Sequence, residues 1–229
     1  MKNLVQLSAV VVLGLGTLSQ AQQIDWGSEI FSNLVDSEGN TLDDTFVFQL
    51  GAFDAGYNPV DYDPDDWLDH WQVFDQADYN GIEDPLDDGI WGYYTSTANM
   101  ESDGTSDSPD ESPGATSFEG RQAYIWIRNG DNPEPGTEWL LVTTSTWVYP
   151  TANPGCCGNG LPLEWSSSDL TGSDVPLWGS QGGVTGSGEY TVTGPYTQQT
   201  FTFAVPEPSA VLLIGMSGAF LVGRRKRPA

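Results

Sequence analysis

Short runs of aromatic and β-branched residues alternate along this chain with clusters of glycine, proline, asparagine and aspartate. Such alternation is typical of β-strands joined by turns. Ser-Glu-Gly-Asn at residues 37–40 predicts a tight turn between the first two strands. Residues 124–127 are apolar without alternation, which predicts a strand buried on both faces. We therefore expect an all-β body, a β-sandwich of jelly-roll or Greek-key type. The candidate strands are residues 29–35, 45–53, 90–94, 122–128, 139–146, 189–193 and 200–204.

One stretch has helical rather than strand-like spacing. Pro64 suits the first turn of a helix, and the two aspartates after it suit the positive end of the helix dipole. The spacing predicts one short helix that ends near Asp78 and caps the sandwich, with its aromatic face packed inward. A sugar-stacking face is the alternative. The aromatic residues on that face are Trp67, Trp71 and Phe74.

The first residues have the pattern of an export signal. Lys2 precedes an apolar stretch over residues 4–18, and Ser19 and Ala21 place small residues at the positions that define a cleavage site. This pattern predicts a secretory signal peptide over residues 1–21. We expect cleavage after Ala21, export through the inner membrane and an extracellular body over residues 22–204.

The last segment, residues 205–229, combines three features. It opens with a motif in which two prolines keep the chain extended and accessible. The apolar run that follows, residues 210–223, measures roughly 21 Å as a helix, which is short of the ~30 Å hydrocarbon core of a membrane. A basic cluster at the end stays on the cytoplasmic side. The order of these three features predicts a sorting tail whose short hydrophobic helix anchors the protein in the membrane transiently. The motif residues are Val205, Pro206, Glu207, Pro208 and Ser209, and the basic residues are Arg224, Arg225, Lys226 and Arg227.

The tail resembles the PEP-CTERM sorting signal of exported bacterial proteins, with Pro206, Glu207 and Pro208 as the motif. The resemblance implies cleavage near the motif by an exosortase, a membrane-embedded cysteine protease. It also implies delivery to the cell surface, the outer envelope or the extracellular matrix, often in bacteria that make exopolysaccharide. An exopolysaccharide or another glycan is therefore an expected partner.

Charge separates the body from the two ends. Of the 7 basic residues only Arg121 and Arg128 lie in the body, whereas of the 32 acidic residues only Glu207 lies outside it. So acidic a surface repels nucleic acid and anionic lipid, and it attracts divalent cations. Nine tryptophans, nine tyrosines and nine phenylalanines argue against disorder. We expect one folded domain without a nucleic-acid partner.

Acidic residues gather in three clusters, over residues 61–66, 83–89 and 103–111. Alternating aspartates in a turn supply several of the oxygens that calcium requires. The first cluster departs from an EF-hand, because Asp66 stands where that loop needs glycine and Gln72 where it needs glutamate. Two interpretations stay open, a solvated acidic loop and a looser calcium site. The candidate ligands are Asp61, Asp63, Asp65, Asp87 and Asp88.

Two adjacent cysteines, Cys156 and Cys157, lie between glycines. Exported proteins usually pair their cysteines. Neighbouring Cα atoms are only ~3.8 Å apart, however, so a disulfide between these two would be strained. A vicinal disulfide, two intermolecular bridges and two free thiols all stay open.

Motifs of catalysis are missing from the sequence. It contains no Gly-x-Ser-x-Gly, no His-Glu-x-x-His and no phosphate-binding loop, and His70 is its single histidine. We expect a non-enzymatic protein without catalytic residues, which acts as a structural or interaction component of the envelope or extracellular matrix. The alternatives are a calcium-assisted carbohydrate-binding module and, third, a glycan-active hydrolase, for which two carboxylates suffice.

The body also carries a set of short aromatic motifs between residues 46 and 178. They are Trp67-x-x-x-Trp71, Asp78-Tyr79-Asn80, the run from Gly120 to Trp126, the run from Glu138 to Val142, and Pro162-Leu163-Glu164-Trp165. In this order they resemble a body that is attached to the same tail in Verrucomicrobia-like exported proteins. The resemblance implies no activity and no catalytic residue.

Overall fold

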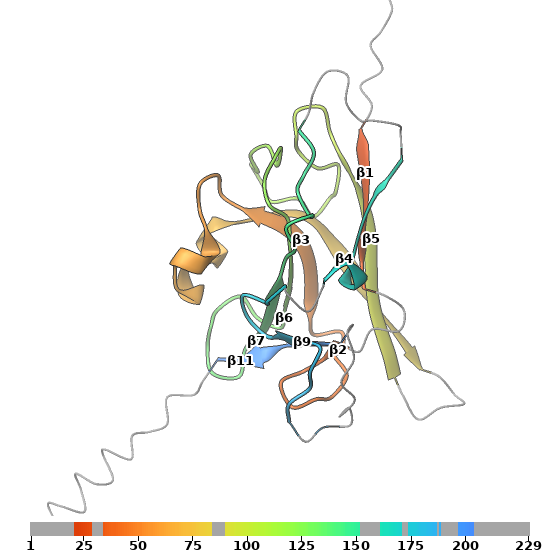
Figure 1. The fold of residues 1–229 in the computed structure, drawn as a ribbon, viewed down its shortest axis with the longest axis vertical. Coiled ribbons are helices and arrows are strands. Elements are labelled where there is room, and N and C mark those ends of the chain that lie inside the picture. Colours follow the sequence, from red (N-terminus) through yellow and green to blue (C-terminus); the bar gives the residue numbers. More distant parts are fainter. Residues whose placement is uncertain are drawn as a thin grey trace, which may run out of the picture.

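The computed structural model describes residues 21–28, 34–83, 90–151, 161–170, 174–186, 188 and 197–203, which are mostly β (Figure 1). This confirms the prediction of a β-rich body. The longer strands are β1 (Gln22–Gly27), β3 (Val47–Phe53), β4 (Trp71–Glu83), β5 (Ile90–Met100), β6 (Tyr124–Arg128), β7 (Glu138–Val142) and β8 (Leu163–Ser166). The short ones are β2 (Leu34–Val35), β9 (Ser180–Gln181), β10 (Gln198–Gln199) and β11 (Phe201–Thr202). Four single 3-10 turns complete the described elements: η1 (Pro59–Asp61), η2 (Pro64–Asp66), η3 (Leu68–His70) and η5 (Ser167–Asp169).

The described strands form two sheets. The larger has eight strands in the order β11-β7-β6-β3-β4-β5-β1-β8, and the smaller has three in the order β2-β10-β9. Neighbours are antiparallel except for the pairs β1 with β8 and β2 with β10. The long strand β4 joins the two halves of the larger sheet, since its first part pairs with β3 and its second part with β5. The jelly-roll or Greek-key type of sandwich stays a prediction.

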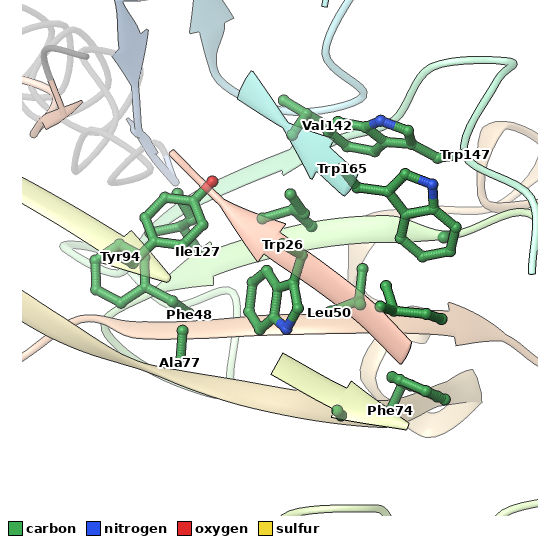
Figure 2. Packing of buried hydrophobic residues seen from close by; sticks show 14 of the residues in the cluster. Trp26, Phe48, Leu50, Phe74, Ala77, Tyr94, Ile127, Val142, Trp147 and Trp165 are labelled. Carbon is green, nitrogen blue, oxygen red and sulfur yellow. The ribbon is translucent and has the colours of Figure 1, made fainter. Parts of the chain in front are cut away.

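Both halves of the larger sheet contribute to one inner core. Trp26 of β1 and Tyr94 of β5 have ring centroids 5.8 Å apart, and Tyr94 lies 4.8 Å from Phe48 of β3. Figure 2 shows these three rings together, with Leu50 and Trp165 beside them. All five side chains are buried. Each contributes roughly 2 kcal/mol to the free energy of folding by leaving water. Since these side chains come from both halves of the larger sheet, their packing stabilises its curled form.

A second group of buried side chains, the outer aromatic cluster, lies on the opposite face of β3, β4, β6 and β7. Strand β6 contributes to both faces: Tyr124 and Trp126 point into the outer cluster, and Ile125 and Ile127 into the inner core. This confirms the prediction that residues 124–127 are buried on two sides. The outer aromatic cluster consists of Phe53, Trp67, Trp71, Val73, Tyr124, Trp126, Trp139, Leu141 and Phe203.

The predicted helix from Pro64 to about Asp78 is wrong. Residues 59–70 form three separate 3-10 turns, and the chain then enters β4 at Trp71. Pairing of β4 with β3 satisfies backbone groups over a long distance in the chain, and this outweighs a weak local preference for helix. The register shifts opposite Leu50 and Gly51, where β4 has one extra residue, Phe74. Alternation along the strand places Phe74 in the inner core and Trp71 in the outer cluster, and the shift lets Asp75 face the inner core as well.

The predicted turn over residues 37–40 is confirmed. The Asp36 amide donates to the Asn40 carbonyl at 2.7 Å, and Gly39 has a φ of 91°, which favours glycine. The turn connects β2 to Thr41, which bridges back to Val35.

Several predicted strands correspond to observed ones, and others do not. Residues 45–53 and 122–128 contain β3 and β6, residues 139–146 overlap β7, and residues 90–94 begin β5. Residues 34–35 form β2, and residues 200–204 contain β11. Strands β1, β4, β8, β9 and β10 were not predicted from the sequence. Residues 29–33 and 189–193 lie outside the described residues.

Other predictions also fall outside the described residues. They concern residues 1–20 of the signal peptide, the tail from Val205 onward, Asp87, Asp88, Cys156 and Cys157. Strand β1 begins at Gln22, one residue after the expected cleavage position, but the signal peptide itself stays a prediction. No helix within the described ranges is long and apolar enough to cross a membrane.

Candidate functional site

The loop between β3 and β4 is the most exposed aromatic feature among the described residues. Figure 1 shows it as the coiled orange segment that projects from the sheet. Tyr62 is 51% exposed, and its ring stacks on Tyr57 at 4.4 Å between centroids. Tyr57 in turn stacks on His70 at 4.1 Å. The end of this stack borders a hollow lined by Val60, Asp61, Tyr62, Asp63 and Asp66.

Hydrogen bonds at its base attach the loop to the sheet. His70 Nδ1 lies 3.1 Å from Asp54 Oδ2, and the Gln72 side chain donates to the other oxygen of Asp54 at 3.1 Å. The buried ring of Trp67 donates to the Pro59 carbonyl at 3.1 Å. Partial burial, followed by the charge of Asp66 and by Tyr62, raises the pKa of Tyr57. The aromatic stack is therefore held in place before any ligand arrives.

The calcium candidates are only partly placed. Asp61, Asp63 and Asp65 are exposed on this loop, and the carboxylate of Asp61 accepts a hydrogen bond from the Asn58 side-chain Nδ2 at 2.8 Å. Within the described ranges, no three or more histidine, cysteine, aspartate or glutamate side chains are grouped so that they could hold a metal ion. Calcium binding stays a prediction, since Asp87 and Asp88 lie outside those ranges.

Most tryptophans point inward. Seven tryptophans of the described part of the chain are buried, and Trp178 is half-buried with its ring nitrogen donating to the Phe201 carbonyl at 2.9 Å. Trp67 and Trp71, which we expected on a helix face, are 3% and 6% exposed in the outer aromatic cluster. The alternative of a sugar-stacking helix face is therefore wrong. The buried tryptophans are Trp26, Trp67, Trp71, Trp126, Trp139, Trp147 and Trp165.

A buried carboxylate joins the inner core to the loop after β5. Asp75 is 4% exposed, and its two oxygens accept from Trp26 Nε1 at 2.7 Å and from Ser108 Oγ at 2.6 Å. Burial, followed by the charge of Asp75, raises the pKa of the nearby Tyr149 well above its usual value. Nothing in the sequence pattern marked Asp75, because its neighbours in the chain are apolar or amide residues without motif spacing.

Replacing Asp75 by alanine is expected to lower the free energy of unfolding by about 3 kcal/mol, because one buried and one partly buried donor lose their acceptor. Asp75→Asn is the matched control. Its oxygen can still accept from Trp26, and its amide can donate to the Ser108 hydroxyl, so it should lose about half as much or less. Urea unfolding, monitored by tryptophan fluorescence, measures the free energy of unfolding of both variants. Equal losses for the two variants would contradict this role of the hydrogen bonds.

The C-terminal end of the described chain is unusually well held. Thr197, Gln198, Gln199 and Thr200 are at most 1% exposed. Glu138 of β7 accepts from the Ser37 amide at 2.9 Å, from the Ser37 hydroxyl at 2.6 Å and from the Thr200 hydroxyl. These contacts tie the smaller sheet to the larger one. The predicted strand over residues 200–204 includes only Thr200, and no sequence pattern indicated the burial of these four polar side chains.

Phe203 is the last described residue and belongs to the outer aromatic cluster. Directly after it, residues 204–227 match the family model of the PEP-CTERM protein-sorting motif. The chain carries a PEP-CTERM sorting signal. This supports the first part of the resemblance: the protein is exported and sorted to the cell surface or envelope, which is consistent with an exosortase as its processing partner.

The PEP-CTERM match covers the tail alone. No curated protein and no solved structure matches the chain. The resemblance of the body to Verrucomicrobia-like proteins therefore stays a prediction, and the residues that the PEP-CTERM signal uses, from Val205 to Arg227, lie outside the described ranges.

Proposed function

We propose that the body of this PEP-CTERM protein is a structural or interaction component of the envelope or extracellular matrix and carries no catalytic activity. The observation that supports this best is the inward orientation of its tryptophans. Binding modules for polysaccharides use large aromatic faces in contact with solvent, whereas here these rings stabilise the two cores. The proposed role depends on the folded surface rather than on a pocket.

The charge of that surface supports an extracellular role. Arg128, one of the two basic residues of the body, is 6% exposed. Its guanidinium lies over the Trp126 ring at 4.8 Å and donates to the Gln49 side chain at 2.7 Å, and burial lowers its pKa. The surface is therefore almost purely acidic. Its charge keeps copies of the body soluble and repels anionic lipid once the transient anchoring of the tail in the inner membrane has ended.

A second candidate function is calcium-assisted glycan binding, and the loop after β3 favours it. Tyr62 exposes its ring at the end of a stacked pair, and the carboxylates of Asp61, Asp63 and Asp66 line the same hollow. An aromatic face with hydrogen-bond acceptors around it suits the C–H face and the hydroxyl groups of a sugar. A glycan-active hydrolase is the third candidate and has no comparable support.

Glycan-array binding by residues 22–205, with and without calcium, tests the two functions. We expect no specific binding, because seven tryptophan rings of the described chain are buried. Binding to one glycan that is lost in Tyr62→Ala would overturn the structural proposal in favour of the module. Val175→Ala is the control, since Val175 is also exposed, at 78%, but lies outside the loop.

A further inference from the structure

The segment from Thr197 to Phe203, the docked segment, ends where the sorting signal begins. It forms β10 in the smaller sheet and β11 at the edge of the larger one. Gln198 pairs with Leu34 and Gln181, so strands lie on both sides of β10. This short piece of chain is therefore part of the fold and not a linker to the tail.

Side-chain hydrogen bonds reinforce the strand pairing. The side-chain Nε2 of Gln199 donates to the backbone carbonyls of Asp36 at 3.0 Å and of Thr185 at 2.7 Å. Its side-chain Oε1 accepts from the backbone N–H of Thr185 at 2.9 Å. The Thr200 amide donates to the Val35 carbonyl at 3.0 Å. Detaching this segment would expose several buried polar groups together with the protein groups they satisfy.

Phe203 holds the very end of the docked segment. Its ring stacks on Trp178 at 4.3 Å between centroids and meets the edge of Trp139 at 4.7 Å. Its amide donates to the Thr137 carbonyl at 3.1 Å. In contrast, Phe201 is 36% exposed, and its backbone carbonyl accepts a hydrogen bond from the Trp178 ring nitrogen.

Very little chain separates this anchor from the motif. Only Ala204 and Val205 lie between Phe203 and Pro206. Three residues span at most about 11 Å when fully extended. A protease binds its substrate as an extended segment, and cleavage close to a folded domain proceeds from the form in which the chain has opened locally.

We propose that Phe203 and the docked segment are positioning elements that limit processing, so that the exosortase cleaves at the motif from the form in which this segment has left the sheet. The inference rests on the PEP-CTERM sorting function. It assigns a rate-setting role to residues of the body that lie before the matched signal.

The test follows cleavage of the full chain by pulse-chase and immunoblot in a bacterium that has an exosortase. Phe203→Ala should be processed at least tenfold faster, because its anchor to Trp139 and Trp178 is lost. Tyr62→Ala removes an exposed aromatic ring outside the docked segment, so it should keep the original rate. Inserting Gly-Ser-Gly-Ser between Phe203 and Ala204 should also accelerate processing, since it lengthens the reach without changing the body.

A combined variant separates this role from a loss of stability. With the insertion present, Phe203→Ala should add no further acceleration, because the motif is already accessible. A further gain in the combined variant, or an insertion variant processed no faster than the original chain, would overturn the proposal. Pro206→Ala with Glu207→Ala serves as the parallel arm: cleavage of that variant would contradict the sorting function itself and not the role of Phe203.

Discussion

Replacing both Pro206 and Glu207 by alanine is expected to leave the chain uncleaved and retained in the inner membrane, with at least a tenfold loss of the processed form. The two prolines around Glu207 keep the motif extended, which is the form that a protease binds, and Glu207 is its only charge. Without recognition, the apolar run and the basic end hold the precursor at the membrane. An immunoblot of membrane and released fractions measures the ratio of the two forms.

The body provides a matched control for the same two residue types. Pro162 and Glu164 are exposed at and beside β8. Pro162→Ala with Glu164→Ala should be processed like the original chain. If the motif variant is also processed normally, the tail is not the signal that directs this protein.

Trp126→Ala is expected to have the largest effect on stability, a loss of roughly 4 kcal/mol in the free energy of unfolding. Trp126 is fully buried, and its ring centroid lies 4.8 Å from Trp139 and 5.2 Å from Trp71. Removing it leaves a large cavity among rings that strand pairing prevents from closing in. For a domain of this size the melting temperature should fall by about 10 °C. Thermal and urea unfolding followed by circular dichroism measure both quantities.

Two further variants show whether the ring or the fold around it matters. Trp126→Phe keeps much of the buried area, and the Trp126 ring nitrogen makes no hydrogen bond within the described part of the chain, so its loss should be well below that of alanine. Tyr62→Ala removes an exposed ring and should change stability by less than about 0.5 kcal/mol. An alanine effect at Trp126 as small as that at Tyr62 would contradict the role of the outer aromatic cluster.

Local patterns in the sequence sufficed for the features that depend on local chemistry. The turn at residues 37–40 follows from glycine at a position of positive φ, and the two-sided burial of β6 follows from a run without polar residues. The sorting tail was also predictable from local sequence, because its motif, apolar run and basic end follow one another along the chain and are recognised without a tertiary structure.

The helix prediction failed because the same aromatic residues fit both the 3.6-residue period of a helix and the two-residue period of a strand. Trp67, Trp71 and Phe74 have the spacing of a helical face, yet Trp71 and Phe74 lie on opposite faces of β4. Gly51 of β3 permits the close pairing of β3 with this part of β4. A Cβ added there would lie 2.3 Å from the Gln72 carbonyl and 2.6 Å from the Trp71 ring, so only glycine lets the two strands approach so closely. Contacts between distant residues decided the outcome.

By itself the sequence determined that the protein is exported and sorted through its tail, that its body is β-rich and acidic, and that its many aromatic residues require a folded core. Tertiary structure alone decided which aromatic rings are buried, how Asp75 and Glu138 join separate segments, and how far the fold extends toward the motif. The physical reason is that sorting signals are recognised as extended chain, whereas burial and hydrogen bonding in a sheet depend on partners far away in the sequence.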